Sequence, residues 1–244
     1  MKIVSLSPSL TDILVALKGE DCLVGVSDAC EINGRPLGRI GPPKAVQMQR
    51  LQSLSPDWIL GDSQDNRPEE LESIQKRWKT KVFAVRKMEN VYDTIAELGR
   101  LTAKQNEARN LNQTIQQEVS SNEDFFRNRA KKRTVLLVWD TPYLTVNFDT
   151  YPSHLLEASG GVNVFREEPL REFPVEMEDM IEREPQLLLL SGDPAPFKKR
   201  HIAQFRRYRI FSGIPIYIIE GKFLSLYGAR TFEALRRLRK IYQE

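Results

Sequence analysis

Several features that define common function classes are scarce or absent in this sequence. Only two cysteines and two histidines occur among 244 residues. Cys22 lies in an apolar run and Cys30 just after one, which favours two reduced core thiols over a disulfide or a metal site. The chain contains no G-x-S-x-G, H-E-x-x-H, P-loop or G-x-G-x-x-G pattern. We therefore expect a protein that is not an enzyme and requires no cofactor.

A long hydrophobic run and a large net charge are also missing. No stretch approaches the roughly 20 apolar residues of a membrane helix, and no basic, apolar leader precedes Ile3. We expect no membrane insertion and, for the chain as it stands, a cytoplasmic location; a periplasmic or cell-envelope location would follow if a leader had been removed.

The net charge of +3 is small beside 36 basic and 33 acidic residues. The most basic segment, residues 197–209, has Ile202, Phe205 and Tyr208 on one helical side, as an ordinary solvated helix does. We expect a monomer that binds no nucleic acid.

What the sequence does contain is a regular alternation of apolar runs with amphipathic segments. With 41% hydrophobic residues, the chain can bury one large core or two smaller ones. Residues 1–88 read as a first α/β lobe with a parallel sheet. Its strands are expected at 2–6, 23–26, 57–61 and 81–85, and its helices at 9–17, 47–54 and 68–78.

A different pattern occupies residues 89–131. Apolar residues recur at helical spacing from Val91 to Val119, and no proline interrupts them. This predicts one long connecting helix to about residue 129, with any break near 120–122.

The first pattern returns over residues 132–244. Strands are expected at 134–140, 186–192 and 214–219, helices at 153–158, 176–183, 197–205 and 230–242, and the GGVNVF segment continues the alternation. The segment LSPDWILGD, 54–62, is echoed by EPQLLLLSGD, 184–193. We therefore predict an α/β fold with two Rossmann-like lobes, central parallel sheets, one long backbone helix and a ligand cleft between the lobes.

The expected ligand site lies at the turns that follow the strands, because open parallel sheets bind ligands beyond the carboxyl ends of their strands. Ser7 and Pro8 would start a helix whose first-turn amides, with Ser9, can bind a negative group or a carbonyl. Further candidates are Asp28, Pro42, Pro43, Asp62, Ser63, Gln64, Trp139, Tyr143, Tyr151, Phe173, Asp193, Tyr227 and Arg230. For His154 two alternatives stay open: an exposed side chain, or a contact with a ligand or metal.

Six segments carry a resemblance to a known family. They are IVSLSPSLTDILVAL, LVGVSD, MQRLQSLSPDWILGD, LLEASGGVNVF, MEDMIEREPQLLLLSGD and YGARTFEAL, in order over nearly the whole chain. Together they resemble the substrate-binding proteins of cobalamin and iron-siderophore ABC importers, the helical-backbone metal receptors, and within them the cobalamin-binding members. The resemblance implies capture of a corrinoid or a ferric siderophore, without catalysis, for an ABC permease.

The resemblance also implies residue roles, and some positions depart from them. Gln49 and Glu178 stand where the family has two glutamates that dock into permease arginines, so one of the two carboxylates is missing. Ala29 and Pro43 replace two aromatic clamps, Phe173 lies one residue from another, and Leu226 replaces an arginine. An intracellular relative that binds another small molecule without a permease, or a metal-dependent enzyme, is the alternative.

Overall fold

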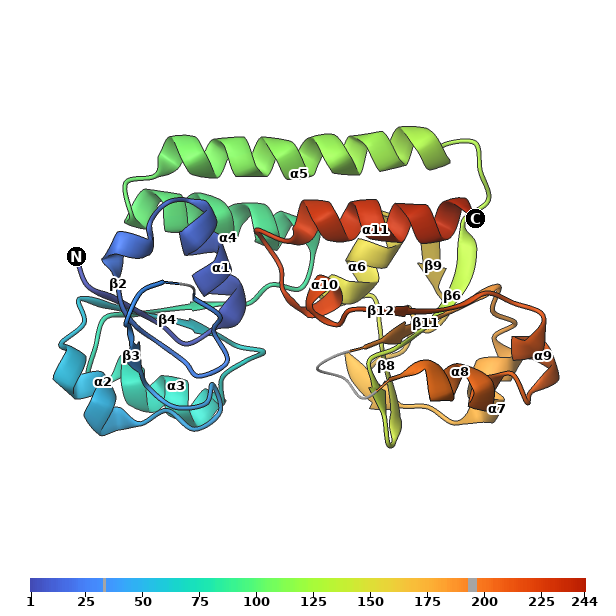
Figure 1. Cartoon of the computed structure of the whole chain (residues 1–244), viewed down its shortest axis with the longest axis horizontal. Coiled ribbons are helices and arrows are strands. Elements are labelled where there is room, and N and C mark those ends of the chain that lie inside the picture. Colours follow the sequence, from blue (N-terminus) through green and yellow to red (C-terminus); the bar gives the residue numbers. More distant parts are fainter. Residues whose placement is uncertain (33, 193–196) are drawn as a thin grey trace. The chain divides into compact units, whose positions relative to one another are not determined.

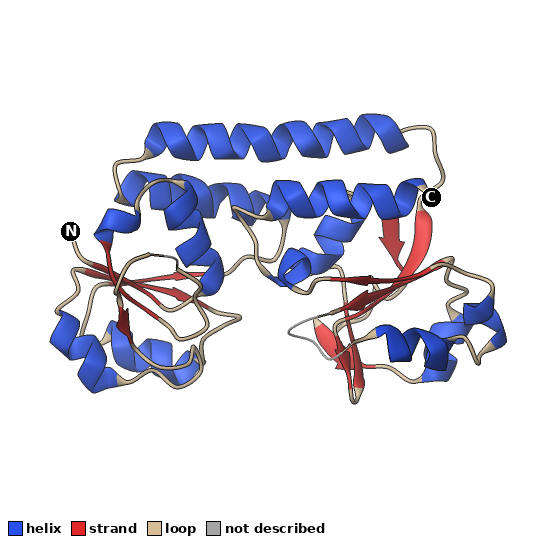
Figure 2. Ribbon diagram, in the orientation of Figure 1, coloured by secondary structure: helices blue, strands red, loops and turns tan. Residues whose placement is uncertain are grey.

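The computed structural model describes residues 1–32, 34–192 and 197–244, which form two compact units. Unit 1 comprises Met1–Val85 and Glu89–Gln113, and unit 2 comprises Arg86–Met88 and Thr114–Glu244. Each unit contains a parallel sheet with helices on both of its faces (Figures 1 and 2). The predicted α/β class with two lobes is therefore confirmed.

Unit 1 is built on a five-stranded sheet in the order β3-β2-β1-β4-β5. Every pair of neighbouring strands is parallel, so all five carboxyl ends lie at one edge. The strands are β1 (Ile3–Ser5), β2 (Leu23–Val26), β3 (Gly38–Arg39), β4 (Trp58–Asp62) and β5 (Thr80–Phe83). All but β3 match predicted strands.

Alternation along β1 assigns its two faces to different helices. Val4 joins Leu51 and Leu71 in a buried cluster, so it faces α2 (Met48–Leu54) and α3 (Pro68–Gln75). Ser5 faces the opposite way, where its hydroxyl oxygen is 2.9 Å from Thr11 Oγ1 of α1 (Pro8–Ala16). Pro8 and Pro68 each stand in the first turn of their helix, where proline lacks no required hydrogen bond. A short 3₁₀ turn, η1 (Glu20–Cys22), precedes β2.

A pair of glycines sets the position of α2 on the sheet. A Cβ atom built on Gly25 would lie 2.4 Å from Leu54 Cδ1, and one on Gly38 would lie 2.8 Å from Leu54 Cδ2. Leu54, the last residue of α2, therefore fills a notch that exists because β2 and β3 each carry a glycine there. A side chain at either position would require Leu54 to move.

The helical region after β5 consists of two helices, so the prediction of one long helix is wrong in this respect. They are α4 (Met88–Leu101) and α5 (Gln105–Phe126), separated at Ala103, which has a φ of 56°. A Cβ atom on Gly99 would lie 2.4 Å from Ala108 Cβ, and Asn112 Nδ2 donates to Tyr92 O at 3.0 Å. The chain thus turns back, and the apolar stripe packs α5 on α4; α5 begins in unit 1 and ends in unit 2.

Unit 2 contains a four-stranded parallel sheet in the order β12-β11-β6-β9. On one face of this sheet, a core of aliphatic and phenylalanine side chains packs against α7, α8 and α9. The helices α6, α10 and α11 cover the other face of the sheet (Figure 1). The strands are β6 (Lys132–Leu137), β9 (Gly161–Asn163), β11 (Leu187–Ser191) and β12 (Ile216–Ile219). The helices are α6 (Tyr151–Glu157), α7 (Met177–Glu182), α8 (Lys199–Phe205), α9 (Arg209–Ser212), α10 (Lys222–Ser225) and α11 (Thr231–Gln243).

A small antiparallel sheet in unit 2 was not predicted. It has the order β10-β8-β7 and consists of β7 (Trp139–Asp140), β8 (Tyr143–Val146) and β10 (Glu172–Pro174). The single strand expected at 134–140 is divided between β6 and β7. Val138, between them, donates its N–H to Leu144 O at 2.8 Å, so the chain leaves the main sheet one residue after β6.

The two main sheets share a common arrangement. In unit 1, β4 pairs with the first strand β1 on one side and with β5 on the other. In unit 2, β11 pairs with the first strand β6 on one side and with β12 on the other. The two segments whose sequences echo each other, 54–62 and 184–193, therefore supply equivalent strands, β4 and β11.

Glu97 provides a test of how α4 is held against β5. The Glu97 carboxylate accepts a hydrogen bond from Arg100 at 2.6 Å and another from Lys81 of β5. These bonds lower the pKa of Glu97 to about 2, and the bond from Arg100 has the larger effect. Because this folded-state pKa is below the ordinary 4.5, the stabilisation is present above pH 4.5 and is lost as the pH falls toward 2. We expect Glu97→Gln to lower the free energy of unfolding by about 1 kcal/mol at pH 7.

Urea unfolding of the wild type and the variant between pH 7 and pH 3 checks this expectation. The difference between the two proteins should shrink as the pH falls. Asp124→Asn is the control, because Asp124 near the end of α5 and Arg127 just after it form a well-exposed pair that should contribute little. A loss in Glu97→Gln that does not change with pH would contradict the assignment.

Candidate functional site

The carboxyl edge of the unit 1 sheet is a candidate ligand site. The strand order places β1 between β2, which follows it, and β4, so the order reverses beside β1. Ligands of open parallel sheets bind where the order reverses. Two turns meet there: the β1–α1 turn with Ser7, and the β4–α3 turn with residues 63–67.

The start of α1 differs in one respect from the prediction. Ser7 occupies the position before the helix, but its hydroxyl does not cap α1. It donates instead to Asp65 Oδ2 at 2.5 Å. Ser9, predicted to contact the ligand, is only 2% exposed and lies inside the unit. A carboxylate of the protein itself is therefore hydrogen-bonded at the start of α1.

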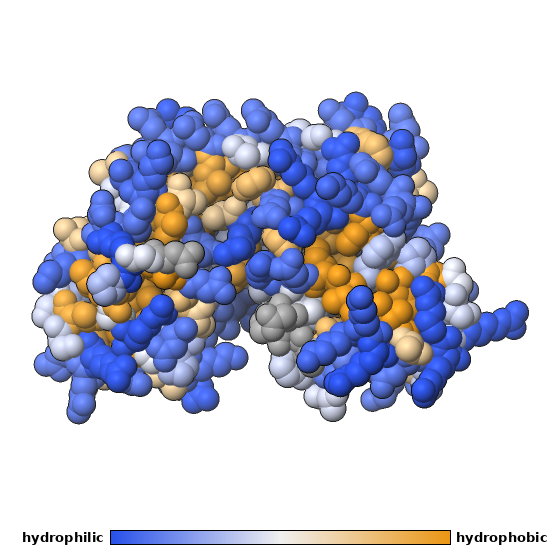
Figure 3. All heavy atoms as spheres, viewed as in Figure 1, coloured by the Kyte–Doolittle hydropathy of each residue, from blue (hydrophilic) through white to orange (hydrophobic). Residues whose placement is uncertain are grey.

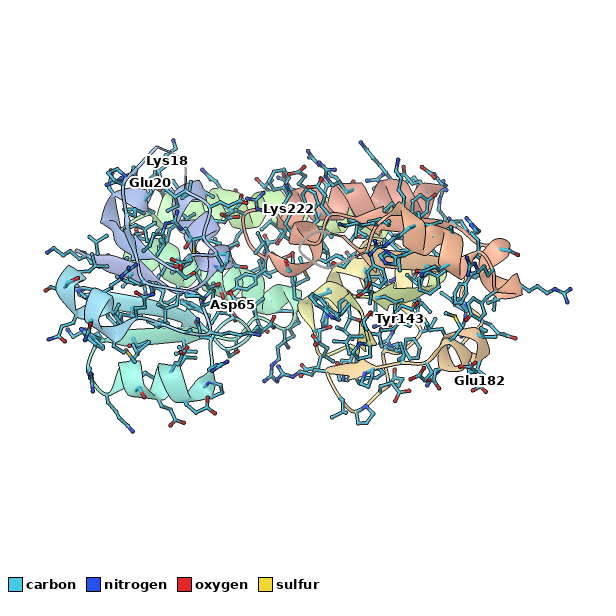
Figure 4. All side chains as sticks on the ribbon, turned by 60° about the horizontal axis from the view of Figure 1, so that its bottom comes forward. Lys18, Glu20, Asp65, Tyr143, Glu182 and Lys222 are labelled. Carbon is cyan, nitrogen blue, oxygen red and sulfur yellow. The ribbon has the colours of Figure 1, made fainter. Side chains whose placement is uncertain are left out.

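Asp65 was missed by the sequence analysis, which named its neighbours Asp62, Ser63 and Gln64. It is half-buried on the loop after β4, at the edge where the strands of unit 1 end (Figure 4). Burial raises the pKa of the Asp65 carboxyl, and the hydrogen bond from Ser7 and the charge of Lys44 only partly oppose this rise. The sequence did contain a signal for Asp65. It is an acidic residue in the turn after β4, and β4 pairs in parallel with β1, so this turn lies beside the turn that contains Ser7.

Asp62 builds the turn rather than lining its surface. It is fully buried, and its Oδ1 accepts the N–H of Gln64 at 2.7 Å. Asn66 completes the turn: its Oδ1 accepts the N–H of Asp62 at 2.8 Å, and its Nδ2 donates to Pro43 O at 2.7 Å. The predicted residues Asp62, Ser63 and Pro43 are thus brought together, with the Ser63 side chain exposed.

A buried polar cluster lies behind the same edge. Thr11 Oγ1 and Ser27 Oγ are each 3.2 Å from Cys30 Sγ, and Arg39 Nη1 donates to Cys30 O at 2.7 Å. Burial raises the pKa of the Cys30 thiol. Both cysteines are free, as predicted, with Cys30 buried and Cys22 half-buried. Asp28, next to Ser27, is exposed at this edge, and its N–H bonds to Gly41 O.

The aromatic candidates of unit 2 do not share one face. In the antiparallel sheet, Tyr143 pairs with Asp140 and Phe173 pairs with Thr145, which places Tyr143 and Phe173 on one side. Both pack against the core, Tyr143 on Phe205 with ring centroids 5.4 Å apart. Trp139 pairs with Leu144 on the opposite side and is 44% exposed. Successive side chains of a strand point to opposite faces of the sheet, so these rings lie on different sides, which the prediction did not take into account.

Tyr151 and Tyr227 lie in the interior of unit 2. Their exposed fractions are 1% and 3%, and their rings pack edge to face. The Tyr151 hydroxyl is 2.9 Å from Thr231 Oγ1, and burial raises the pKa of Tyr151 far above its ordinary value. Arg230, half-buried, stands directly before α11. Asp193, expected after β11, lies outside the described residues.

The two histidines lie in different surroundings. His154 is half-buried on α6. His201 of α8 is buried; its Nδ1 accepts the N–H of Lys198 at 2.7 Å, and its Nε2 is 3.3 Å from Asp140 Oδ2. Within residues 1–32, 34–192 and 197–244, no three His, Cys, Asp or Glu side chains are grouped as metal ligands would be.

The two predicted docking positions are both on surface helices. Gln49 is exposed in the first turn of α2, and Glu178 is exposed in the first turn of α7. The N–H of Glu176 donates to Asp179 Oδ2 at 2.9 Å, which fixes the start of α7. A helix that is both long and apolar enough to span a membrane does not occur in the described part of the chain.

Each unit also has a groove between its edge strand and a following helix. One of about 520 Å³ lies between β5 and α4, and one of about 580 Å³ lies between β12 and α11. The second is lined by Ile218, Ile219 and Ile241 and by the charged side chains of α11, and Figure 3 shows hydrophobic atoms beneath that helix bordered by hydrophilic ones. Neither groove is lined by a residue predicted to contact the ligand.

The sequence matches the family model described as "Periplasmic binding protein" over residues 3–218. The chain belongs to the periplasmic binding protein family. Among curated members, the vitamin B12-binding protein of Vibrio vulnificus strain YJ016 is 24% identical over 193 residues, which cover 78% of this chain and 71% of that protein.

Solved structures agree with this assignment at the level of the fold. The periplasmic vitamin B12 binding protein BtuF of Vibrio cholerae has a TM-score of 0.84 at 21% identity, covering 100% of this periplasmic binding protein and 98% of BtuF. The haem-binding protein RhuT from Roseiflexus sp. RS-1, in its apo form, has a TM-score of 0.85 at 19% identity, covering 99% and 97%. The family match confirms the resemblance to periplasmic binding proteins, and the solved structures show that the fold is shared.

The buried thiol gives a direct test of the unit 1 edge. Because burial raises the pKa of Cys30 and restricts access, the thiolate needed for reaction is scarce. In a Cys22→Ser variant at pH 8, we expect Cys30 to react with a coloured disulfide reagent at least about tenfold more slowly than the single thiol of Cys30→Ser. Unfolding in urea should remove the difference; equal rates in the folded proteins would contradict the buried placement.

Proposed function

We propose that this periplasmic binding protein captures a corrinoid or a ferric siderophore and releases it chemically unchanged. The observation that carries the proposal is the match to a curated vitamin B12-binding protein over 78% of the chain. The likeness of the whole fold to BtuF and to a haem-binding protein supports a large, metal-containing ligand. The protein itself needs no cofactor for this function, because the metal belongs to the ligand.

Unit 1 would contribute polar contacts from its carboxyl edge. The exposed residues there are Asp28, Ser63 and Gln64, and Pro43 is half-buried beside them. The Asp62–Asn66 turn holds this surface through hydrogen bonds between the two side chains and the backbone, so it is ordered before a ligand arrives. Amide groups on the periphery of a corrinoid match such a surface.

Unit 2 would contribute an aromatic contact. Trp139 is the exposed ring of the small sheet and can stack on a planar macrocycle. Tyr143 and Phe173 support the hairpin from its core side, and their direct contact with a ligand stays a prediction. Arg230 would meet a polar group on the ligand.

We further propose delivery of the ligand to an ABC permease. Glu178 is available on α7 for an arginine of such a partner, whereas Gln49 on α2 can offer only a neutral amide. A neutral group gains less from an arginine than a carboxylate does, so docking would be weaker than with two glutamates. The cytoplasmic location, the monomeric state and the role of Gln49 stay predictions.

A tryptophan-fluorescence titration tests the ligand class. We expect cobalamin, cobinamide, haem or a ferric siderophore to quench the wild-type protein with a Kd below about 10 μM. Trp139→Phe should show a smaller maximal quench and weaker binding. Trp58→Phe is the matched control, because Trp58 begins β4 at the opposite edge of the unit 1 sheet. Absence of quenching by all four compounds below 10 μM would contradict the proposal.

A further inference from the structure

The start of α1 carries a feature with consequences for ligand choice. Asp65 Oδ2 accepts the hydroxyl proton of Ser7 at 2.5 Å, and Ser7 directly precedes the helix. Peptide N–H groups at the beginning of a helix create positive potential. The Asp65 carboxylate therefore occupies the region that an anionic group of a ligand would otherwise favour.

The placement of Asp65 is costly to the fold. The carboxyl is half-buried, and removal from water disfavours its charged form. Lys44 is the cation that acts on it, while the buried Cys30 thiol is within electrostatic reach. The Asp65 carboxyl lies at the edge where the strand order reverses, and burial disfavours its charged form. This combination is typical of a functional position.

We propose that Asp65 determines ligand specificity: its carboxylate favours a ligand edge that carries neutral hydrogen-bond donors, such as corrin amides, over an edge that carries carboxylates. The inference rests on the proposed function and deepens it, because it separates corrinoids from ligands with anionic edges such as haem. An amide N–H can donate to the carboxylate, whereas a ligand carboxylate is repelled by it.

Two corrins with the same ring provide the sharpest test. Cobinamide carries peripheral amides, and cobyrinic acid carries carboxylates at the corresponding positions. Their dissociation constants are measured by fluorescence at pH 7.5 for the wild type, Asp65→Asn, Ser7→Ala and a control, Asp21→Asn. Asp21 has a side chain that is 92% exposed beside Arg35, so its variant makes the same charge change away from the strand ends.

We expect the wild type to prefer cobinamide. Asp65→Asn should reduce that preference at least about tenfold, equivalent to about 1.4 kcal/mol, and Asp21→Asn should leave it unchanged. Ser7→Ala removes the donor that holds the carboxylate, so it should reduce the preference by less. Asp65→Asn removes a disfavoured charge and keeps an acceptor for Ser7, so its melting temperature should not fall below that of the wild type.

The possible failures are distinct. If the wild type binds both corrins and Asp65→Asn changes their ratio less than twofold, the role of Asp65 is wrong and the proposed function stands. If the wild type binds neither corrin but binds haem or a ferric siderophore, the preference for corrin amide edges is wrong while ligand capture stands. If it binds neither corrin, nor haem, nor a ferric siderophore, both proposals are wrong.

Discussion

The common direction of the strands in each main sheet is the constraint on which the rest of this molecule depends. Parallel neighbours cannot be joined by tight hairpins, so each connection crosses over through a helix or a long loop. The crossovers cover both faces of the sheet, which is why β11 is five buried residues in succession. They also bring every strand-to-helix turn to one edge, where side chains distant in sequence meet.

That edge is chemically different in the two units. In unit 1 the edge consists of small polar side chains that form hydrogen bonds with one another and with the backbone. Thr11 and Ser27 contact Cys30, and Asn66 bonds to the backbone of both Asp62 and Pro43. In unit 2 an antiparallel hairpin is inserted after β6, and its Tyr143 ring packs on Phe197 and Phe205 of the core while Trp139 is exposed. The unit 1 edge therefore presents hydrogen-bonding groups, whereas the unit 2 hairpin presents the exposed ring of Trp139.

The sequence predicted the regular part of this architecture because proline and apolar runs mark it clearly. Pro8 and Pro68 locate helix starts, and the runs of β4 and β11 can be buried only as central strands. The turn between α4 and α5 has no such mark: Ala103 adopts a left-handed conformation that is more usual for glycine, and Gly99, four residues earlier, lies inside α4. Helical spacing alone cannot distinguish one long helix from two that fold back on each other.

The turns after β1 and β4 lie at the carboxyl edge of the unit 1 sheet, as the strand pattern predicted, and their contact with a ligand stays a prediction. Three residues predicted to line the site, Ser9, Asp62 and Tyr151, are buried. Burial of a polar or aromatic side chain depends on neighbours from other segments, such as Thr231 for Tyr151, and a linear pattern does not contain them. Asp65 was overlooked for the same reason, since its partner Ser7 belongs to another strand-to-helix turn.

The notch formed by Gly25 and Gly38 has an effect at the opposite end of α2. Leu54 anchors the helix at its last turn, and Gln49 stands one residue after the first, Met48. The way α2 lies on the sheet, and with it the side on which Gln49 is exposed, therefore depends on Leu54 and the two glycines. A larger residue at either glycine would force Leu54 to move, so a change at a strand position reaches the helix that carries Gln49 without altering any residue on the exposed face of α2.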